Sequence, residues 1–312
     1  MGIPAVLLVA LIVVLVLRFH APPEVARLLP ESDAIVYMNL KPVRAASHFD
    51  AAPVNPSPEY ARFLEGTGFR WDRDLDRVAV SLHRMANPNG PNGNVAYSGV
   101  LEGRFDGKKV TRYLQAQSVA HEQYAGHDIY TVPGDEGRSL RVAVLGYDMV
   151  AASNMPTPEQ IHSIIDRHSA GALPFSGSSL LSLRYSEVPY FALAWGIGHV
   201  GLPFSDRGNI QVFGVTLPMS EDTDFIASLT FPGSVHLRIE ELAPSEAEAG
   251  KTAMNLSTIL NLVRGFTPGT GTAQDVAMHE VFESLKVEQK KSRVVLTGNV
   301  PATLLQSATR TP

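Results

Sequence analysis

The chain has 312 residues, of which 45% are hydrophobic and 18% charged, a composition that excludes a disordered chain and is sufficient for one large or two medium domains. The net charge of -5 and the pI near 6.1 provide no basic surface for nucleic acid, so we expect no nucleic-acid partner. The absence of cysteine excludes disulfides, thiolate nucleophiles and cysteine-ligated metals.

The first stretch of the chain predicts a membrane anchor. Residues 3–17 carry no charged or polar side chain, and Arg18, Phe19 and His20 close the run. As a helix from Met1 it would span roughly 26 Å, near the lower limit for a hydrocarbon core of about 30 Å. No basic residue precedes the run and 19–23 make a poor cleavage site, which favours a retained anchor over a signal peptide or a buried core helix. We expect a single-pass anchor at 1–20 with the lipid bilayer as its partner.

The side of the membrane is less well defined by the residues themselves. The nearby basic residues Arg18, Arg27, Lys41 and Arg44 all follow the anchor, which by itself favours a cytoplasmic body. The charge bias is small, so both orientations stay open at this point.

Residues 21–171 predict a first α+β lobe. An apolar run of strand length at 33–40 is typical of a central strand. Turn formers at 87–94 join two strands into a hairpin, and Thr157, Pro158 and Gln160 open a helix with Ile161, Ile164, Ile165 and His168 on its inner face. The other expected elements are a helical turn at 25–29, helices at 42–49, 59–66 and 108–117, and strands at 75–85, 95–105, 128–132, 140–145 and 149–153.

Residues 172–312 predict a second lobe on a similar plan. Strands are expected at 190–195, 210–217, 225–231 and 235–239. A capping box at 245–248 begins a helix with an apolar stripe, and Thr272 caps a second helix to Leu285. A hairpin at 286–300 follows, and Pro301 opens a terminal helix. Residues 150–156 and 295–301 resemble each other at an offset of 145, which suggests two related lobes.

The motifs that could carry chemistry are weak. The G-x-G-x-x-G at 196–201 follows a strand, but Pro203 and the turn at 206–209 prevent the helix that a pyrophosphate needs, so a glycine-rich bend is the simpler interpretation. One of the serines at 176–179 reads as a helix N-cap, without the glycines of a nucleophile elbow. The charges at 71–74 and 240–241 are interpreted as surface charge, and Trp195 as a core residue.

Histidines and carboxylates give one candidate metal site. His121, Glu122 and His127 do not have the H-E-x-x-H spacing. Two helices each carry a carboxylate–histidine set that could meet between the lobes, but two solvated helix faces are the simpler interpretation, because each set lies opposite an apolar stripe. The residues are Glu159, His162 and Asp166 on one helix and Asp275 and His279 on the other. We assign no catalytic, cofactor-binding or metal residues, and no cofactor.

Two segments resemble an uncharacterised family of bacterial membrane-anchored α+β proteins: LLPESDAIVY at 28–37, close behind the anchor, and SLKV at 284–287. The resemblance implies an exported, membrane-tethered domain and supplies no catalytic residues. We therefore expect a non-enzymatic binding or structural module of the bacterial envelope, with an extracytoplasmic, periplasmic body and an unknown protein or envelope partner. Two alternatives stay open: a metal-dependent hydrolase that uses His162 and His279, and a sensor of a small apolar ligand held between the lobes.

Overall fold

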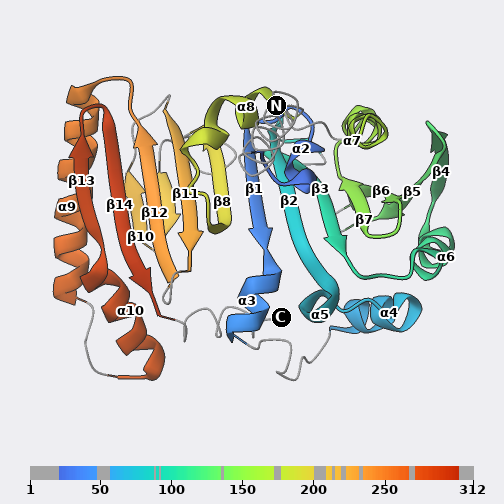
Figure 1. Ribbon diagram of the computed structural model, residues 1–312, viewed down its shortest axis with the longest axis horizontal. Helices are drawn as coiled ribbons and strands as arrows, with labels where there is room; N and C mark the ends of the chain where they lie inside the picture. Colours follow the sequence, from blue (N-terminus) through green and yellow to red (C-terminus); the bar gives the residue numbers. More distant parts are fainter. Residues whose placement is uncertain are drawn as a thin grey trace, which may run out of the picture.

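The computed structural model describes residues 21–47, 57–87, 89–90, 93–134, 137–171, 177–199, 209–212, 215–218, 223–231, 235–266 and 271–301. It confirms a mixed α+β fold, built on one large antiparallel sheet (Figure 1). The twelve strands of this sheet lie in the order β13-β14-β12-β11-β8-β1-β2-β3-β7-β6-β5-β4.

The strands of the main sheet are β1 (Ala34–Asn39), β2 (Leu75–Arg84), β3 (Val95–Gly103), β4 (Ala120–Tyr124), β5 (His127–Pro133), β6 (Ser139–Leu145), β7 (Met149–Ser153), β8 (Ala192–His199), β11 (Asp224–Thr230), β12 (Val235–Leu242), β13 (Lys286–Lys290) and β14 (Arg293–Val300). The α-helices are α2 (Glu24–Arg27), α3 (Leu40–Ser47), α4 (Pro58–Thr67), α5 (Trp71–Asp74), α6 (Gly107–Gln117), α7 (Glu159–Ser169), α8 (Ser179–Arg184), α9 (Glu246–Phe266) and α10 (Ala273–Ser284), with a 3-10 turn at Tyr185–Glu187.

The two halves of the sheet share one strand order. Outward from the centre, β1, β2, β3 and β7 follow one another on one side, and β8, β11, β12 and β14 on the other. The centre is the antiparallel pair β1–β8, in which Tyr37 lies opposite Trp195. Strands from before and after residue 171 therefore form one continuous sheet. The two similar sequence segments, 150–156 and 295–301, begin on β7 and β14, which occupy corresponding positions in the two halves.

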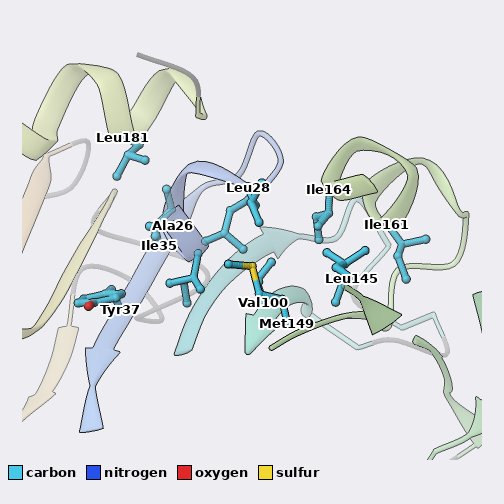
Figure 2. Close-up of a cluster of buried hydrophobic side chains, with 14 of the residues drawn as sticks. Ala26, Leu28, Ile35, Tyr37, Val100, Leu145, Met149, Ile161, Ile164 and Leu181 are labelled. Carbon is cyan, nitrogen blue, oxygen red and sulfur yellow. The ribbon is translucent and has the colours of Figure 1, made fainter. Parts of the chain in front are cut away.

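One face of the sheet is covered by α2, α7 and α8, whose apolar residues form a core cluster with the central strands (Figure 2). The predicted stripe of α7 is confirmed, since Ile161, Ile164 and Ile165 are fully buried. Trp195 is 3% exposed and stacks on Tyr37 at a centroid distance of 5.4 Å, as expected for a core residue. Burial also raises the pKa of the Tyr37 hydroxyl to about 12.

The opposite face carries helices at both ends (Figure 1). α9 and α10 pack on β12 and β14, and α6 packs on β5 and β6. Neighbouring residues show the alternation of a strand, since Ala143 belongs to the first face and Val142 contacts α6 on the second. Thr272 and Asp275 form the capping box of α10, and Ser245 accepts a hydrogen bond from the Glu248 amide at the start of α9, as predicted.

Two expectations about secondary structure are wrong, and one strand was not predicted. Residues 120–124 form the edge strand β4, which the sequence does not indicate because its side chains are polar or exposed on both faces. Ala125 (φ 46°) and Gly126 (φ 82°) then make the left-handed turn into β5. Residues 210–217 do not continue the main sheet: β9 (Asn209–Val212) and β10 (Val215–Pro218) pair with each other in a separate sheet, and the sequence places Gly214 between them. Helix α3 begins at Leu40, before Pro42.

The predicted anchor at 1–20 and the terminal helix after Pro301 lie outside the described residues. Within the part of the chain that the structure describes, no helix is long and apolar enough to cross a membrane.

Gly103 is a position where a side chain should not fit. A Cβ added there would lie 2.3 Å from the carbonyl oxygen of Asp74, which is backbone and cannot rotate away. We expect Gly103→Ala to lower the free energy of unfolding by about 1–3 kcal/mol, because the start of β2 must separate from β3. Urea unfolding measures the effect.

The matched control is Gly107→Ala at the start of α6. Its Cβ would make an ordinary 3.8 Å contact with Val144, so stability should hold or rise by about 0.5–1 kcal/mol. Equal stability of the two variants would show that the approach of Asp74 to Gly103 does not constrain the fold.

Candidate functional site

The candidate site lies under α6 in the N-terminal half. Asp106 caps this helix, and its carboxylate accepts hydrogen bonds from the amides of Lys108 (3.0 Å) and Lys109 (3.2 Å). One turn apart on the inner side, Val110 and Leu114 are each 7% exposed. They contact Tyr130 of β5 and Val142 of β6, which fixes the helix over the sheet.

Helix α4 packs beside α6. Ser57 caps its start, and Gly68 ends it in the left-handed conformation at φ 71°. Gly66 allows a close approach, since a Cβ there would lie 2.4 Å from the Tyr113 ring of α6.

Aromatic rings extend the contact between α4 and α6 toward the start of α6. The Phe63 ring makes edge-on contacts with the Tyr113 ring, at a centroid distance of 5.5 Å, and with the Phe69 ring, at 6.2 Å. The Phe69 ring in turn contacts the Phe105 ring edge-on at 6.0 Å. These aromatic contacts hold α4 and the following loop against α6.

Between these helices and the sheet lies a cavity of about 450 Å³, within the size range of small-molecule sites. The described residues that line it are apolar, apart from the Tyr113 hydroxyl and the Gln117 amide, and none carries a charge. It is lined by Phe63, Phe69, Leu75, Leu101, Gly103, Phe105, Val110, Tyr113, Leu114, Gln117, Val132, Pro133, Leu140, Val142, Val150 and Ala152. Such a lining can hold an apolar molecule, and the Tyr113 hydroxyl is the one titratable group among the described lining residues.

The cavity has a buried end and an exposed end. Leu75 and Val110 at one end are buried, whereas Gln117 and Pro133 at the other are the two exposed lining residues. The exposed pair is held together because the chain after α6 bonds to β5, through the amide of Val119 and the carbonyl of Thr131 at 2.8 Å. This exposed end is called the mouth below.

The structure does not bring the two carboxylate–histidine helices together. α7 and α10 lie at opposite ends of the sheet (Figure 1). His162 bonds instead to Glu122 of β4 at 2.7 Å and stacks on Tyr124 at 3.7 Å, while Asp166 accepts a hydrogen bond from the Tyr124 hydroxyl. The polar side of α7 is therefore packed against β4.

Asp275, His121 and His127, three other residues considered as metal ligands, make structural contacts. Asp275 caps α10, and its hydrogen bonds to Thr272 lower the pKa of its carboxyl. His121 bonds to Asp128 at 2.9 Å and stacks on Tyr130, and the Nδ1 of His127 lies 3.3 Å from the carbonyl of Val144. The described residues contain no group of three or more histidine or carboxylate side chains that could hold a metal ion.

The structure also shows the roles of the described residues in the glycine motif at 196–201 and among the serines at 176–179. Gly196 and Gly198 lie within β8, so neither a phosphate loop nor a bend begins at Gly196. A serine N-cap was expected within 176–179, and the structure identifies it as Ser178, whose hydroxyl accepts a hydrogen bond from the amide of Leu181 at 3.2 Å.

Interpreting 71–74 and 240–241 as surface charge is wrong for three carboxylates. Asp72 is 1%, Glu240 5% and Glu241 0% exposed. Arg70 donates to Asp72 at 3.1 Å and Arg238 to Glu240 at 2.6 Å, so neighbouring guanidinium groups compensate the burial of these two carboxylates. Glu241 accepts a hydrogen bond from the Thr252 hydroxyl at 3.3 Å.

A buried serine–histidine network was not indicated by the sequence. The Nε2 of His83 lies 3.2 Å from the Ser81 hydroxyl and 3.1 Å from the Ser98 hydroxyl, which is itself 2.9 Å from that of Ser153. The pairing is that of a nucleophile and a base, but Ser81 and Ser98 are fully buried, so no substrate reaches them. The network satisfies polar groups inside the sheet.

His83 makes the stability of the fold depend on pH. Burial lowers its pKa, against a smaller opposing effect of the Asp33 carboxylate. Below the ordinary pKa of about 6.5 the unfolded chain binds a proton that the folded chain does not, so the free energy of unfolding should fall as the pH drops from 7 to 5. In His83→Gln, the free energy of unfolding measured with urea should fall less between pH 7 and pH 5 than in the parent chain. An equal fall in both would contradict the role of His83 in this pH dependence.

Comparisons with known proteins give the fold alone. No family model matches the chain, and no curated protein matches it. Among solved structures, the chain resembles "Structure of crystal form III of TP0453" with a TM-score of 0.51 and 10% identity, over 92% of this chain and 97% of that chain. Crystal form I of TP0453 aligns with a TM-score of 0.47 and 8% identity, over 93% of this chain and 99% of that chain. The chain thus shares a mixed α+β fold with crystal form III of TP0453.

Proposed function

We propose that this chain is a membrane-tethered, non-enzymatic binding module of the bacterial envelope that holds an apolar ligand in its N-terminal half. The observation that carries the proposal is the cavity under α6, whose described lining is apolar and uncharged. The site lies within one half of the sheet, and not between the two halves as the sequence suggested for an apolar ligand. The apolar run within residues 1–20 supports the membrane tether. The sequence resemblance at 28–37 and 284–287 supports a periplasmic body with a protein or envelope partner.

We also propose that the two halves descend from one duplicated lobe, divided near residue 171. The shared strand order around the β1–β8 pair supports this history, as does the correspondence of β7 with β14. In this proposal the ligand cavity belongs to the N-terminal copy, where α6 packs over the sheet.

Photolabelling tests the ligand site. The full chain would be placed in phosphatidylcholine nanodiscs with a long-chain alcohol that carries a diazirine near its tail. We expect labelled peptides from α6 and from β5–β7, and we expect excess unlabelled dodecanol to suppress this labelling. Labelling confined to residues 1–20, or labelling of α6 that dodecanol does not suppress, would refute the ligand site.

A cysteine-free chain makes the orientation directly measurable. Ser169 at the end of α7 is exposed, so Ser169→Cys supplies one thiol on the body. We expect a membrane-impermeant maleimide to label it in cells with a permeabilised outer membrane. Labelling only after lysis would place the body in the cytoplasm.

A further inference from the structure

The volume of the cavity limits the size of its ligand. Val110, Leu114 and Gln117 follow one another along α6 over roughly 10.5 Å, and the strands form the opposite wall. The volume of about 450 Å³ equals that of about 15 molecules of liquid water, and at about 27 Å³ per methylene group it equals that of one alkyl chain of about sixteen carbons. Two acyl chains of that length would need about twice the volume of the cavity.

The polarity of the cavity sets the direction of that ligand. Its inner end is apolar and includes the buried residues Leu75 and Val110, whereas the Gln117 amide stands at the exposed mouth. An alkyl tail gains most by filling the inner end, and a polar group at the other end of the ligand can stay in water beside Gln117.

The electrostatics of the mouth favour a neutral polar group. No lysine or arginine is among the described lining residues, so an anionic group would find no counter-charge there. The mouth also lies at the C-terminal end of α6, where the helix dipole is negative and repels an anion.

We propose, building on the function proposed above, that the ligand is a neutral single-chain amphiphile, bound tail-first with its polar end at Gln117. The assignment distinguishes a fatty alcohol or a similar uncharged amphiphile from a fatty acid, a phospholipid and a polycyclic molecule. The proposal also places the polar end of the ligand in contact with Gln117.

The test compares competitors of the diazirine alcohol on the full chain in nanodiscs. Dodecanol should suppress labelling of α6 and β5–β7 at a concentration at least about threefold below that of dodecanoate, and pyrene should compete more weakly than either. Equal or better competition by dodecanoate or pyrene would overturn the ligand class while the labelled site stands. If dodecanol does not suppress labelling at α6, the ligand site itself is refuted, and the proposed ligand class is refuted with it.

A charge at the mouth provides a second, independent readout. Gln117→Lys should improve competition by dodecanoate about threefold or more relative to dodecanol, because the ammonium group meets the carboxylate. Ala116→Lys, one residue earlier and exposed, is the matched control and should leave the ratio unchanged. Equal ratios in both variants and the parent chain would show that the polar end does not lie at Gln117.

Discussion

Ala152→Phe should abolish ligand binding while leaving the fold intact. Ala152 of β7 lines the cavity on the face of the sheet that α6 covers. A phenyl ring there would fill much of the space under Val142 and Leu114, and cavity filling commonly adds about 0.5–2 kcal/mol of stability. We expect photolabelling of α6 to fall about tenfold or more, with no loss in the free energy of unfolding.

Ala116→Phe on the exposed side of α6 is the matched control for that variant. It introduces the same ring within the same half of the molecule, and labelling should stay at the parent level. If Ala152→Phe labels as well as Ala116→Phe, the cavity is not the binding site. If Ala152→Phe unfolds, a smaller filling change, Ala152→Ile, repeats the comparison.

The largest loss of stability should come from Ile164→Ala. Ile164 is fully buried between α7 and strands β6 and β7, beside Leu145 (Figure 2). Removing its branched side chain leaves a cavity in a packed core, which typically costs about 2–5 kcal/mol. Urea unfolding followed by circular dichroism measures the change.

Ser163→Ala, the neighbouring position on α7, controls for the helix itself and should stay within about 0.5 kcal/mol of the parent. A loss at Ile164 no larger than the change at Ser163 would contradict the assignment of this cluster as the core of the fold.

The elements predicted best are those that one segment of sequence specifies by itself. The isoleucine stripe of α7 and the Thr272 cap of α10 combine a helical period with a local start signal. Strand β4 has neither signal, because an edge strand with exposed polar residues has no alternating apolar pattern. Its place is set by pairing with β5, which is a tertiary contact.

The cavity could not be predicted for a different reason. Its lining comes from α4, α6 and five strands, so no segment carries a recognisable motif. Ala151 and Ala152 are identical neighbours, yet Ala151 belongs to the core cluster and Ala152 lines the cavity. Composition likewise cannot tell that Asp72 and Glu240 are buried, because the arginines that pair with them act through the folded geometry.

Methyl NMR of the full chain in nanodiscs tests the ligand cavity most directly. Leucine and valine methyls line the cavity, and no isoleucine does so among the described residues, whereas Ile161, Ile164 and Ile165 report on the core of the other face. Saturating dodecanol should shift the methyl signals of Leu114, Val142 and Val150 and leave those of the three isoleucines in place. Unshifted cavity methyls, or equal shifts on both faces, would contradict the account.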